Sequence, residues 1–162
     1  NKLSKSEFIK VFANIFENAT WIAEKLYEQK PFHDFGELKL KMLDIFETTT
    51  KEKKLKILND HPDLGDKTKI GLLSSNSLKE QTNVGLDQCT KEEFDEFKKL
   101  NNDYKKFGFP FILAIKGKTK IEILENFKRR IYSDSEKEFK EAVNQVKKIA
   151  SLRLEELKNK NF

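Results

Sequence analysis

The chain has 162 residues and a formal net charge of +5, with 37% hydrophobic and 36% charged side chains. Its 14 phenylalanines supply enough apolar area for a packed core, which excludes a disordered chain. Only six glycines and three prolines are present, too few for the turns of an all-β protein. No apolar run approaches the roughly 20 residues that span a bilayer. The length predicts one domain, and the lone Cys89 favours a reducing, intracellular setting.

The positive charge is compatible with binding to nucleic acid, to a membrane surface or to a small anion. Lysine and glutamate alternate along predicted helix faces, however, and arginine occurs only as Arg129, Arg130 and Arg153. Most of the charge is therefore interpreted as a solvated surface, with Arg129 and Arg130 as a surface-like pair.

Four helical segments are predicted in the first 60 residues from apolar spacing. The first carries Phe8 to Phe16 on one face, and the second carries Ile22 to Tyr27 and closes before Pro31. A third stripe runs from Phe35 to Phe46. A short fourth helix with Leu55 and Leu58 ends before the stretch "NDHPDLGD".

The second half predicts four more helices, each with a possible cap at its start. Five Ser/Thr-x-x-Glu patterns resemble capping boxes, in which two side chains satisfy the free amides of a helix start. They are Ser4–Glu7, Ser77–Glu80, Thr90–Glu93, Thr119–Glu122 and Ser135–Glu138. The four predicted helices run from about Leu78 to Gln88, Lys91 to Lys106, Ile121 to Tyr132 and Glu136 to Lys158.

The stretch Phe107–Gly117, "FGFPFILAIKG", is apolar without a helical period, and Gly108 is well placed to end the preceding helix. Its composition favours a strand, but no second strong strand candidate exists to pair with it. We therefore predict a buried extended segment whose backbone groups need other partners, a ligand among them. The fold prediction is an all-α, single-domain multi-helix bundle with this one extended segment.

His61 stands out because it precedes Pro62, which disfavours helical backbone for the residue before it. A histidine held outside a helix can act as a general acid or base, since its pKa lies near neutrality. The alternative is a surface turn in which Asp60 and Asp63 cap neighbouring segments. A metal site would need ligands beyond His61 and Asp63, and the sequence offers no cluster that supplies them.

Two further features have both a structural and a functional interpretation. Ser77 and Glu80 read as a capping box, but a helix start is also an anion site that Glu80 and Gln81 would line. Arg153 falls on the apolar stripe of the last helix, between Ala150 and Leu157. Two interpretations stay open: Arg153 forms an internal salt bridge, or its guanidinium binds a carboxylate of the substrate.

Five motifs in chain order, covering nearly the whole chain, resemble one family. They are "FENATWIAEKLYEQKPF", "HPDLGDK", "SSNSLKEQTNVGL", "LNNDYKKFGFPFILAIKG" and "KIASLRLEEL". They look like the motifs of the 2-oxo-4-hydroxy-4-carboxy-5-ureidoimidazoline (OHCU) decarboxylases. The chain departs from that pattern after Leu64, where the family usually reads "HPDLAG", and the distance from His61 to Glu80 is one residue shorter.

The resemblance assigns roles to particular residues. It implies that His61 and Glu80 are catalytic. It also implies a set of substrate-binding positions, with backbone groups contributing at the aromatic segment: Pro62, Ser77, Gln81, Phe111, Ile112, Leu113 and Arg153.

The resemblance also implies a reaction and a setting. The expected activity is cofactor- and metal-independent loss of CO2 from OHCU to give (S)-allantoin, the last step of urate oxidation. A homodimer is expected, in the cytoplasm or, in a eukaryote, the peroxisome, with no nucleic-acid or membrane partner. Two other classes stay open: a non-catalytic Lys-rich helical module that binds nucleic acid or a protein, and an enzyme for a related ureido or imidazoline acid.

Overall fold

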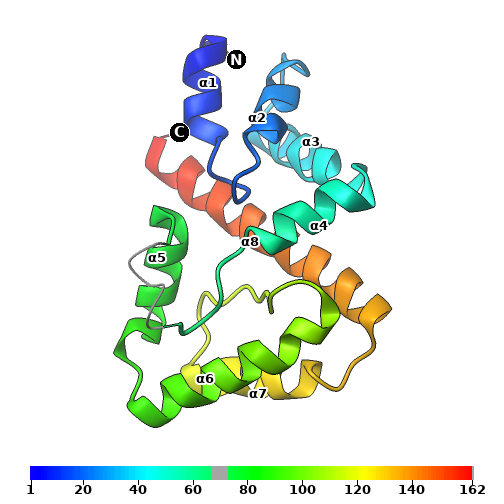
Figure 1. Cartoon of the computed structure of the whole chain (residues 1–162). Coiled ribbons are helices and arrows are strands. Elements are labelled where there is room, and N and C mark those ends of the chain that lie inside the picture. Colours follow the sequence, from blue (N-terminus) through cyan, green and yellow to red (C-terminus); the bar gives the residue numbers. More distant parts are fainter. Residues whose placement is uncertain (67–72, 162) are drawn as a thin grey trace. The chain divides into compact units, whose positions relative to one another are not determined.

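A computed structural model describes residues 1–66 and 73–161, and within these ranges the chain is helical with no strand (Figure 1). This confirms the all-α prediction. The α-helices and the two short 3₁₀ helices are α1 (Lys5–Phe12), α2 (Thr20–Tyr27), α3 (Phe35–Glu47), α4 (Lys51–Asn59), α5 (Ser75–Asn83), η2 (Leu86–Gln88), α6 (Lys91–Tyr104), η3 (Lys105–Phe107), α7 (Lys120–Arg130) and α8 (Ser135–Asn161). None of the described helices is both long and apolar enough to cross a membrane.

The chain divides into two compact units, and each is described by itself. Unit 1 contains Asn1–Asp60 and the chain from Val146 on, whereas unit 2 contains His61–Gln145. The boundary therefore falls immediately before His61 and again within α8. The single-domain expectation stays a prediction.

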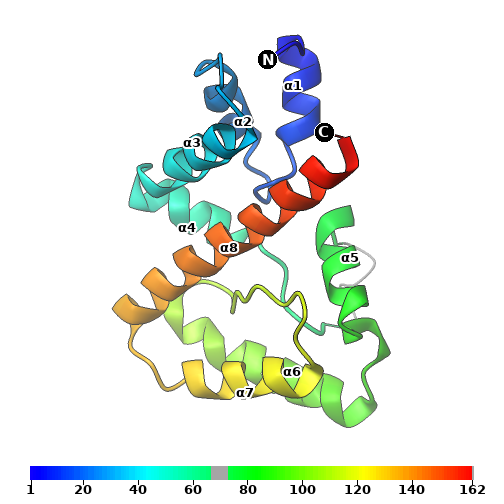
Figure 2. The ribbon, with the colours of Figure 1, turned by 180° about the vertical axis from the view of Figure 1, so that it is seen from behind.

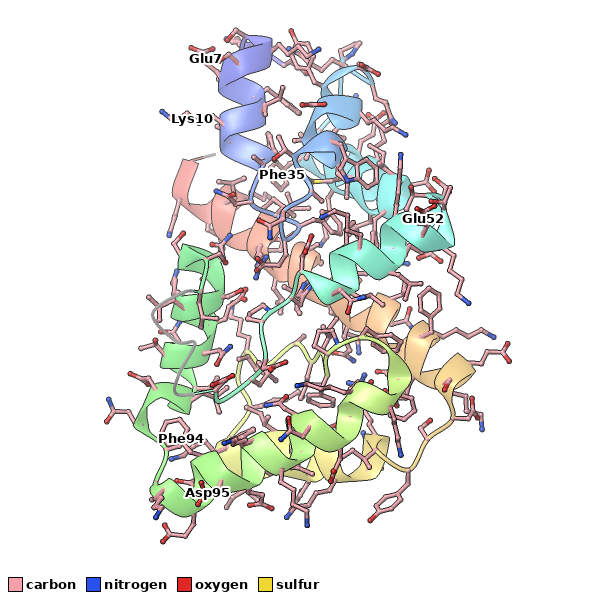
Figure 3. All side chains as sticks on the ribbon, in the orientation of Figure 1. Glu7, Lys10, Phe35, Glu52, Phe94 and Asp95 are labelled. Atoms are coloured by element: carbon pink, nitrogen blue, oxygen red, sulfur yellow. The ribbon has the colours of Figure 1, made fainter. Side chains whose placement is uncertain are left out.

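Unit 1 buries the apolar stripes that the sequence predicts. α1 packs on α2 and α2 packs on α3, with Phe8 and Phe12 of α1 in the core. The exposed Glu7 and Lys10 lie on the side of α1 that faces away from α2 (Figure 3). α1 ends at Phe12, earlier than its apolar stripe, yet Ile15 and Phe16 are still buried after the helix has ended.

Unit 2 is built around the pair α6 and α7, which lie side by side in both views (Figures 1 and 2). Aromatic rings fill the space beside them: Phe111 and Phe127 stack with ring centroids 3.9 Å apart. Gly108 ends the helical stretch with φ of +84°, as predicted. The chain from Phe109 to Ile115 then runs without helix or strand and is almost entirely buried, which confirms a buried extended segment. It is shorter than the predicted Phe107–Gly117, because Phe107 belongs to η3 and Lys116 and Gly117 are exposed.

Three of the five predicted caps are present. Ser4 and Thr90 form complete capping boxes, and Thr119 accepts a hydrogen bond from the backbone of Glu122. The Ser135–Glu138 box is wrong. The Asp134 side chain, and not that of Ser135, accepts the hydrogen bond from the backbone at the start of α8, where the donor is Lys137. α8 therefore begins at Ser135, one residue before the predicted Glu136.

The Ser77–Glu80 box is also wrong. Ser74 is the N-cap of α5, and its hydroxyl accepts a hydrogen bond from the Ser77 backbone. α5 therefore starts three residues earlier than predicted, ends at Asn83 and is separated from η2 by Gly85, with φ of +80°. The sequence "SSNS" offers three serines as possible caps, and spacing to Glu80 selects the wrong one.

Candidate functional site

His61 opens unit 2 in a non-helical stretch directly after α4 and its C-cap Asp60. It is buried, with 8% of its surface exposed, so it is not the surface-turn residue of the alternative interpretation. Pro62 and Asp63 follow half-buried, and Leu64 and Gly65 are buried again. A buried histidine on a loop, outside regular packing, fits the general acid or base that its residue type suggests.

The point where the chain departs from the family pattern has a local physical reason. Gly65 has φ of +68°, a left-handed conformation that strains residues with a side chain. A Cβ at this position would also lie 2.7 Å from the ring of Phe97, which is fully buried. Glycine is therefore favoured at this position, where the motif that the chain resembles has alanine. Residues 67–72, between this loop and α5, lie outside the described part of the chain, so the shorter spacing from His61 to Glu80 stays an observation from the sequence.

Replacing Gly65 with alanine is expected to lower the free energy of unfolding by about 2–5 kcal/mol, from left-handed backbone strain and overpacking against Phe97 together. Gly108→Ala is the matched control, because Gly108 has φ of +84° but open space around its Cα. The control should lose only about 1–2 kcal/mol. Urea unfolding measures both; equal losses would show that Phe97 does not restrict this position.

Ser77, Glu80 and Gln81 share one face of α5, since they are spaced three and four residues apart. Ser77 and Gln81 are buried and Glu80 is half-buried. Because α5 begins at Ser75, Glu80 and Gln81 lie in its second turn rather than the first. The prediction that they line the helix start is therefore wrong, although they share a face.

Gln81 is the residue that ties α5 to the loop after His61. Its Oε1 accepts a hydrogen bond from the Gly65 N–H at 3.1 Å, and its Nε2 donates to the Asp63 carbonyl at 3.2 Å. The described structure thus brings one predicted binding residue against the loop that carries the predicted catalytic histidine.

Side chains, and not a neighbouring strand, satisfy part of the extended segment's backbone. Arg130 Nη1 donates to the Ile112 carbonyl at 2.6 Å, and the Ala114 N–H donates to Gln145 Oε1 at 2.9 Å. The Arg130 guanidinium also lies over the ring of Phe111, 4.5 Å from its centroid. These contacts fix the conformation of the backbone from Phe111 to Leu113 that the resemblance assigns to ligand binding.

Arg130 is itself held by a buried acid and a buried phenol. Its Nε and Nη2 each lie 3.0 Å from Glu138 Oε2, and Tyr104 donates a hydrogen bond to the same oxygen. Burial, together with this bond to Glu138, raises the pKa of Tyr104 well above its ordinary value. The phenol therefore stays protonated and serves as a donor. The interpretation of Arg130 as a surface residue is wrong, since only 5% of it is exposed.

Several buried polar residues of unit 2 were not predicted from the sequence, and helical spacing could have found Arg130 and Asn101. Arg130 follows Ile123 and Phe127 on the apolar stripe of α7, and Asn101 lies between Phe97 and Tyr104 on that of α6. Asn101 Nδ2 donates to the Leu64 carbonyl at 3.0 Å. The same pattern, a polar residue on an apolar stripe, predicted the burial of Arg153.

Arg153 lies in unit 1, on α8, and is buried. Its Nη2 is 3.0 Å from Glu17 Oε1 and its Nη1 donates to the Ile15 carbonyl at 3.1 Å. The internal salt bridge, one of the two interpretations from sequence, is therefore present. Its predicted contact with a ligand, and its convergence with His61 and Glu80, stay predictions.

No group of three or more histidine, cysteine, aspartate or glutamate side chains in the described residues gathers as metal ligands would. His61 and Asp63 are therefore not part of such a group in the described residues. Cys89 is half-buried and its thiol donates to the Leu86 carbonyl. Burial raises the pKa of this thiol, which does not favour a reactive thiolate.

Comparison with known proteins decides the family. The OHCU decarboxylase family matches residues 1–155. A curated OHCU decarboxylase of Halalkalicoccus jeotgali is 35% identical over 158 residues, 97% of this chain and 88% of that protein. The chain belongs to the OHCU decarboxylase family. Its members' name describes a decarboxylase, and the motif-based prediction of this family is confirmed.

Two other proteins similar to this chain are longer than it. A uric acid degradation bifunctional protein of Bacillus sp. (strain TB-90) is 41% identical over 97% of this chain, which spans only 31% of that protein. The crystal structure of an (S)-allantoin synthase matches with a TM-score of 0.77 and 29% identity, over 96% of this chain and 51% of that one. In these relatives a region of this kind is part of a larger polypeptide.

Proposed function

We propose that this chain catalyses the decarboxylation of OHCU to (S)-allantoin and CO2, without a cofactor. The observation that carries the proposal is His61 itself. In a chain that belongs to the family over nearly its whole length, the histidine of the "HPDL" motif is buried on a loop that Gln81 holds.

The reaction needs a place for electrons and a place for a proton. When the bond from the hydroxyl-bearing ring carbon to the carboxylate breaks, its electron pair shifts toward the adjacent ureido-bearing carbon and its ring nitrogen, which gives an enol. The enol hydroxyl then loses its proton and becomes the carbonyl. The ureido-bearing carbon gains a proton on one face, which gives one enantiomer. Preorganised donors aimed at the developing charge lower the barrier.

In the proposed mechanism, His61 takes the proton of the substrate hydroxyl or acts beside the departing carboxylate. Glu80 binds the ureido or ring N–H groups and helps to deliver the final proton to one face. Ser77 lies one turn before Glu80 on α5 and supplies a hydroxyl to the same face of the helix.

Arg153 is proposed to bring the positive charge that an anionic substrate needs. Its planar guanidinium can bind a carboxylate through two parallel hydrogen bonds. The ion pair with Glu17 and the bond to the Ile15 carbonyl fix its orientation in unit 1 before substrate arrives. Peptide groups from Phe111 to Leu113, together with Pro62 and Gln81, are proposed to complete the set of binding residues.

The direct test generates OHCU from urate with a urate oxidase and a hydroxyisourate hydrolase, and then follows its ultraviolet absorbance. The chain should accelerate the decay and release one CO2 per OHCU consumed. Comparison with related ureido acids tests the narrower substrate assignment. Decay at the rate without added protein, together with salt-dependent binding to DNA or RNA, would favour the Lys-rich binding module instead.

Replacing Glu80 with glutamine is expected to lower kcat by about 10²-fold or more, the usual contribution of a positioned acid or base. The product should also lose optical purity, because the intermediate would be protonated from both faces. Glu125→Gln is the matched control, since Glu125 is an exposed glutamate of unit 2. Circular dichroism of the allantoin measures the optical purity, and a variant product as pure as wild type would remove Glu80 from proton delivery.

The assembly and setting of the protein belong to the same proposal. A homodimer is proposed, with the cytoplasm as its compartment, or the peroxisome in a eukaryote. Sedimentation equilibrium of the purified chain distinguishes a dimer from a monomer.

A further inference from the structure

We propose that the side-chain amides of Gln81 and Asn101 act together as a clamp that fixes the loop carrying His61, and that Asn101 is thereby a positioning residue for the reaction. We call these two side chains, Gln81 and Asn101, the amide clamp. The inference rests on the proposed function, because it assigns Asn101 to the same site.

The clamp holds three consecutive residues by their backbone. Gln81 Nε2 donates to the Asp63 carbonyl at 3.2 Å, Asn101 Nδ2 donates to the Leu64 carbonyl at 3.0 Å, and the Gly65 N–H donates to Gln81 Oε1 at 3.1 Å. Only 2% of Gln81 and 7% of Asn101 are exposed. These bonds are therefore shielded from water, and buried backbone groups that lost them would be costly.

The orientation of both amides follows from their partners. A carbonyl can only accept, so the NH2 group of Asn101 must face Leu64, and that of Gln81 must face Asp63. The loop forms no regular secondary structure of its own. Two helices, α5 and α6, thus supply from their side chains the hydrogen bonds that a strand neighbour would otherwise give.

The clamp reaches His61 through a short and stiff connection. His61 is two residues before Asp63 and is joined to it by Pro62, whose ring restricts φ to about −65°. The ring of Phe97, one turn before Asn101 on α6, also leaves no room beside Gly65. A loop held by these hydrogen bonds and by this aromatic ring transmits its position to His61.

The side-chain amide of Asn101 is explained by the hydrogen bond that its Nδ2 donates to the Leu64 carbonyl. Its Oδ1 is buried and has no hydrogen-bond partner among the described residues. Burying such an oxygen without a partner is unfavourable, and a leucine of similar volume would avoid that cost. An amide at this position is therefore explained by the bond that its nitrogen makes to Leu64.

Asn101→Leu tests the proposal because it removes the donor and nearly keeps the volume. We expect kcat for OHCU to fall about 10- to 100-fold, as a misplacement of roughly 1 Å can cause, while KM changes less than about twofold. Asn102→Leu is the matched control, since Asn102 is the neighbouring, exposed asparagine of the same helix. A merely structural residue would not separate kcat from KM in this way.

A second measurement is independent of activity. The chain has only two histidines, His61 and the exposed His33, so ring resonances in NMR report each of them. Asn101→Leu should change the ring chemical shifts of His61 and leave those of His33 as in wild type, and a cooperative urea unfolding transition shows that the variant is folded. This result stands even if the chain does not act on OHCU, so failure of the clamp and failure of the proposed function are distinguishable.

Asn101→Asp keeps the clamp testable if the leucine variant does not fold. A protonated aspartic acid can donate to the Leu64 carbonyl, whereas the carboxylate cannot. The profile of kcat against pH should therefore gain one ionisation, with activity recovering as pH falls. The proposal is overturned if the folded Asn101 variants match Asn102→Leu in kcat, in pH profile and in the His61 resonances.

Discussion

Replacing His61 with asparagine is expected to lower kcat for OHCU by roughly 10²- to 10⁴-fold, the range for loss of a general acid or base. Asparagine keeps a polar side chain that can hydrogen-bond, but it cannot exchange a proton near neutral pH. Because the substitution removes only part of a buried ring, the free energy of unfolding should change by no more than about 1–2 kcal/mol. Activity and urea unfolding are measured on the same preparation.

The other histidine provides the control for this result. His33 is exposed and precedes α3, and the interaction it makes there is that of its backbone N–H with Glu37. His33→Asn should keep wild-type kcat and wild-type stability. A His61→Asn variant as active as His33→Asn would remove His61 from the chemistry.

Replacing Arg130 with methionine is expected to lower the free energy of unfolding by about 3–5 kcal/mol. The reason is that Glu138 would stay buried without the cation that compensates it, and Ile112 would lose the donor to its carbonyl. Adding Glu138→Gln to this variant should recover part of the loss, since the uncompensated charge is then gone. Urea unfolding midpoints and slopes measure both variants.

Arg129→Met separates this buried ion pair from a general effect of losing an arginine. Arg129 is exposed on α7 and donates to Asn126 within the same helix. Its loss should cost less than about 0.5 kcal/mol, as is usual for exposed positions. If the two arginine variants were equally stable, the network around Glu138 would contribute little to the fold.

The extended segment shows how far sequence reasoning reaches. Its lack of period, with Gly108 at its start and no second strand to pair with, correctly predicted a buried non-helical chain. The partners of its backbone could not be predicted, because Arg130 and Gln145 come from helices far along the chain. Adjacent arginines suggested a surface pair, whereas the period of α7 places Arg129 in solvent and Arg130 in the core.

Helix starts and the His61 loop show a second limit. Spacing alone selected Ser77 as a cap, but Ser74 performs that function, and the choice among nearby serines depends on the preceding loop. At the "LGD" departure, the sequence indicated that the loop differs from its family. It could not reveal that Gly65 lies against Phe97 with a positive φ, because that contact joins residues 32 positions apart.

The handedness of the product tests the central claim most directly. Freshly generated OHCU that decays in water passes through an intermediate exposed on both faces and gives racemic allantoin with no circular dichroism. A catalytic amount of this chain, turning over many times, is predicted to give (S)-allantoin with its full circular dichroism signal. A racemic product formed at the uncatalysed rate would contradict the account.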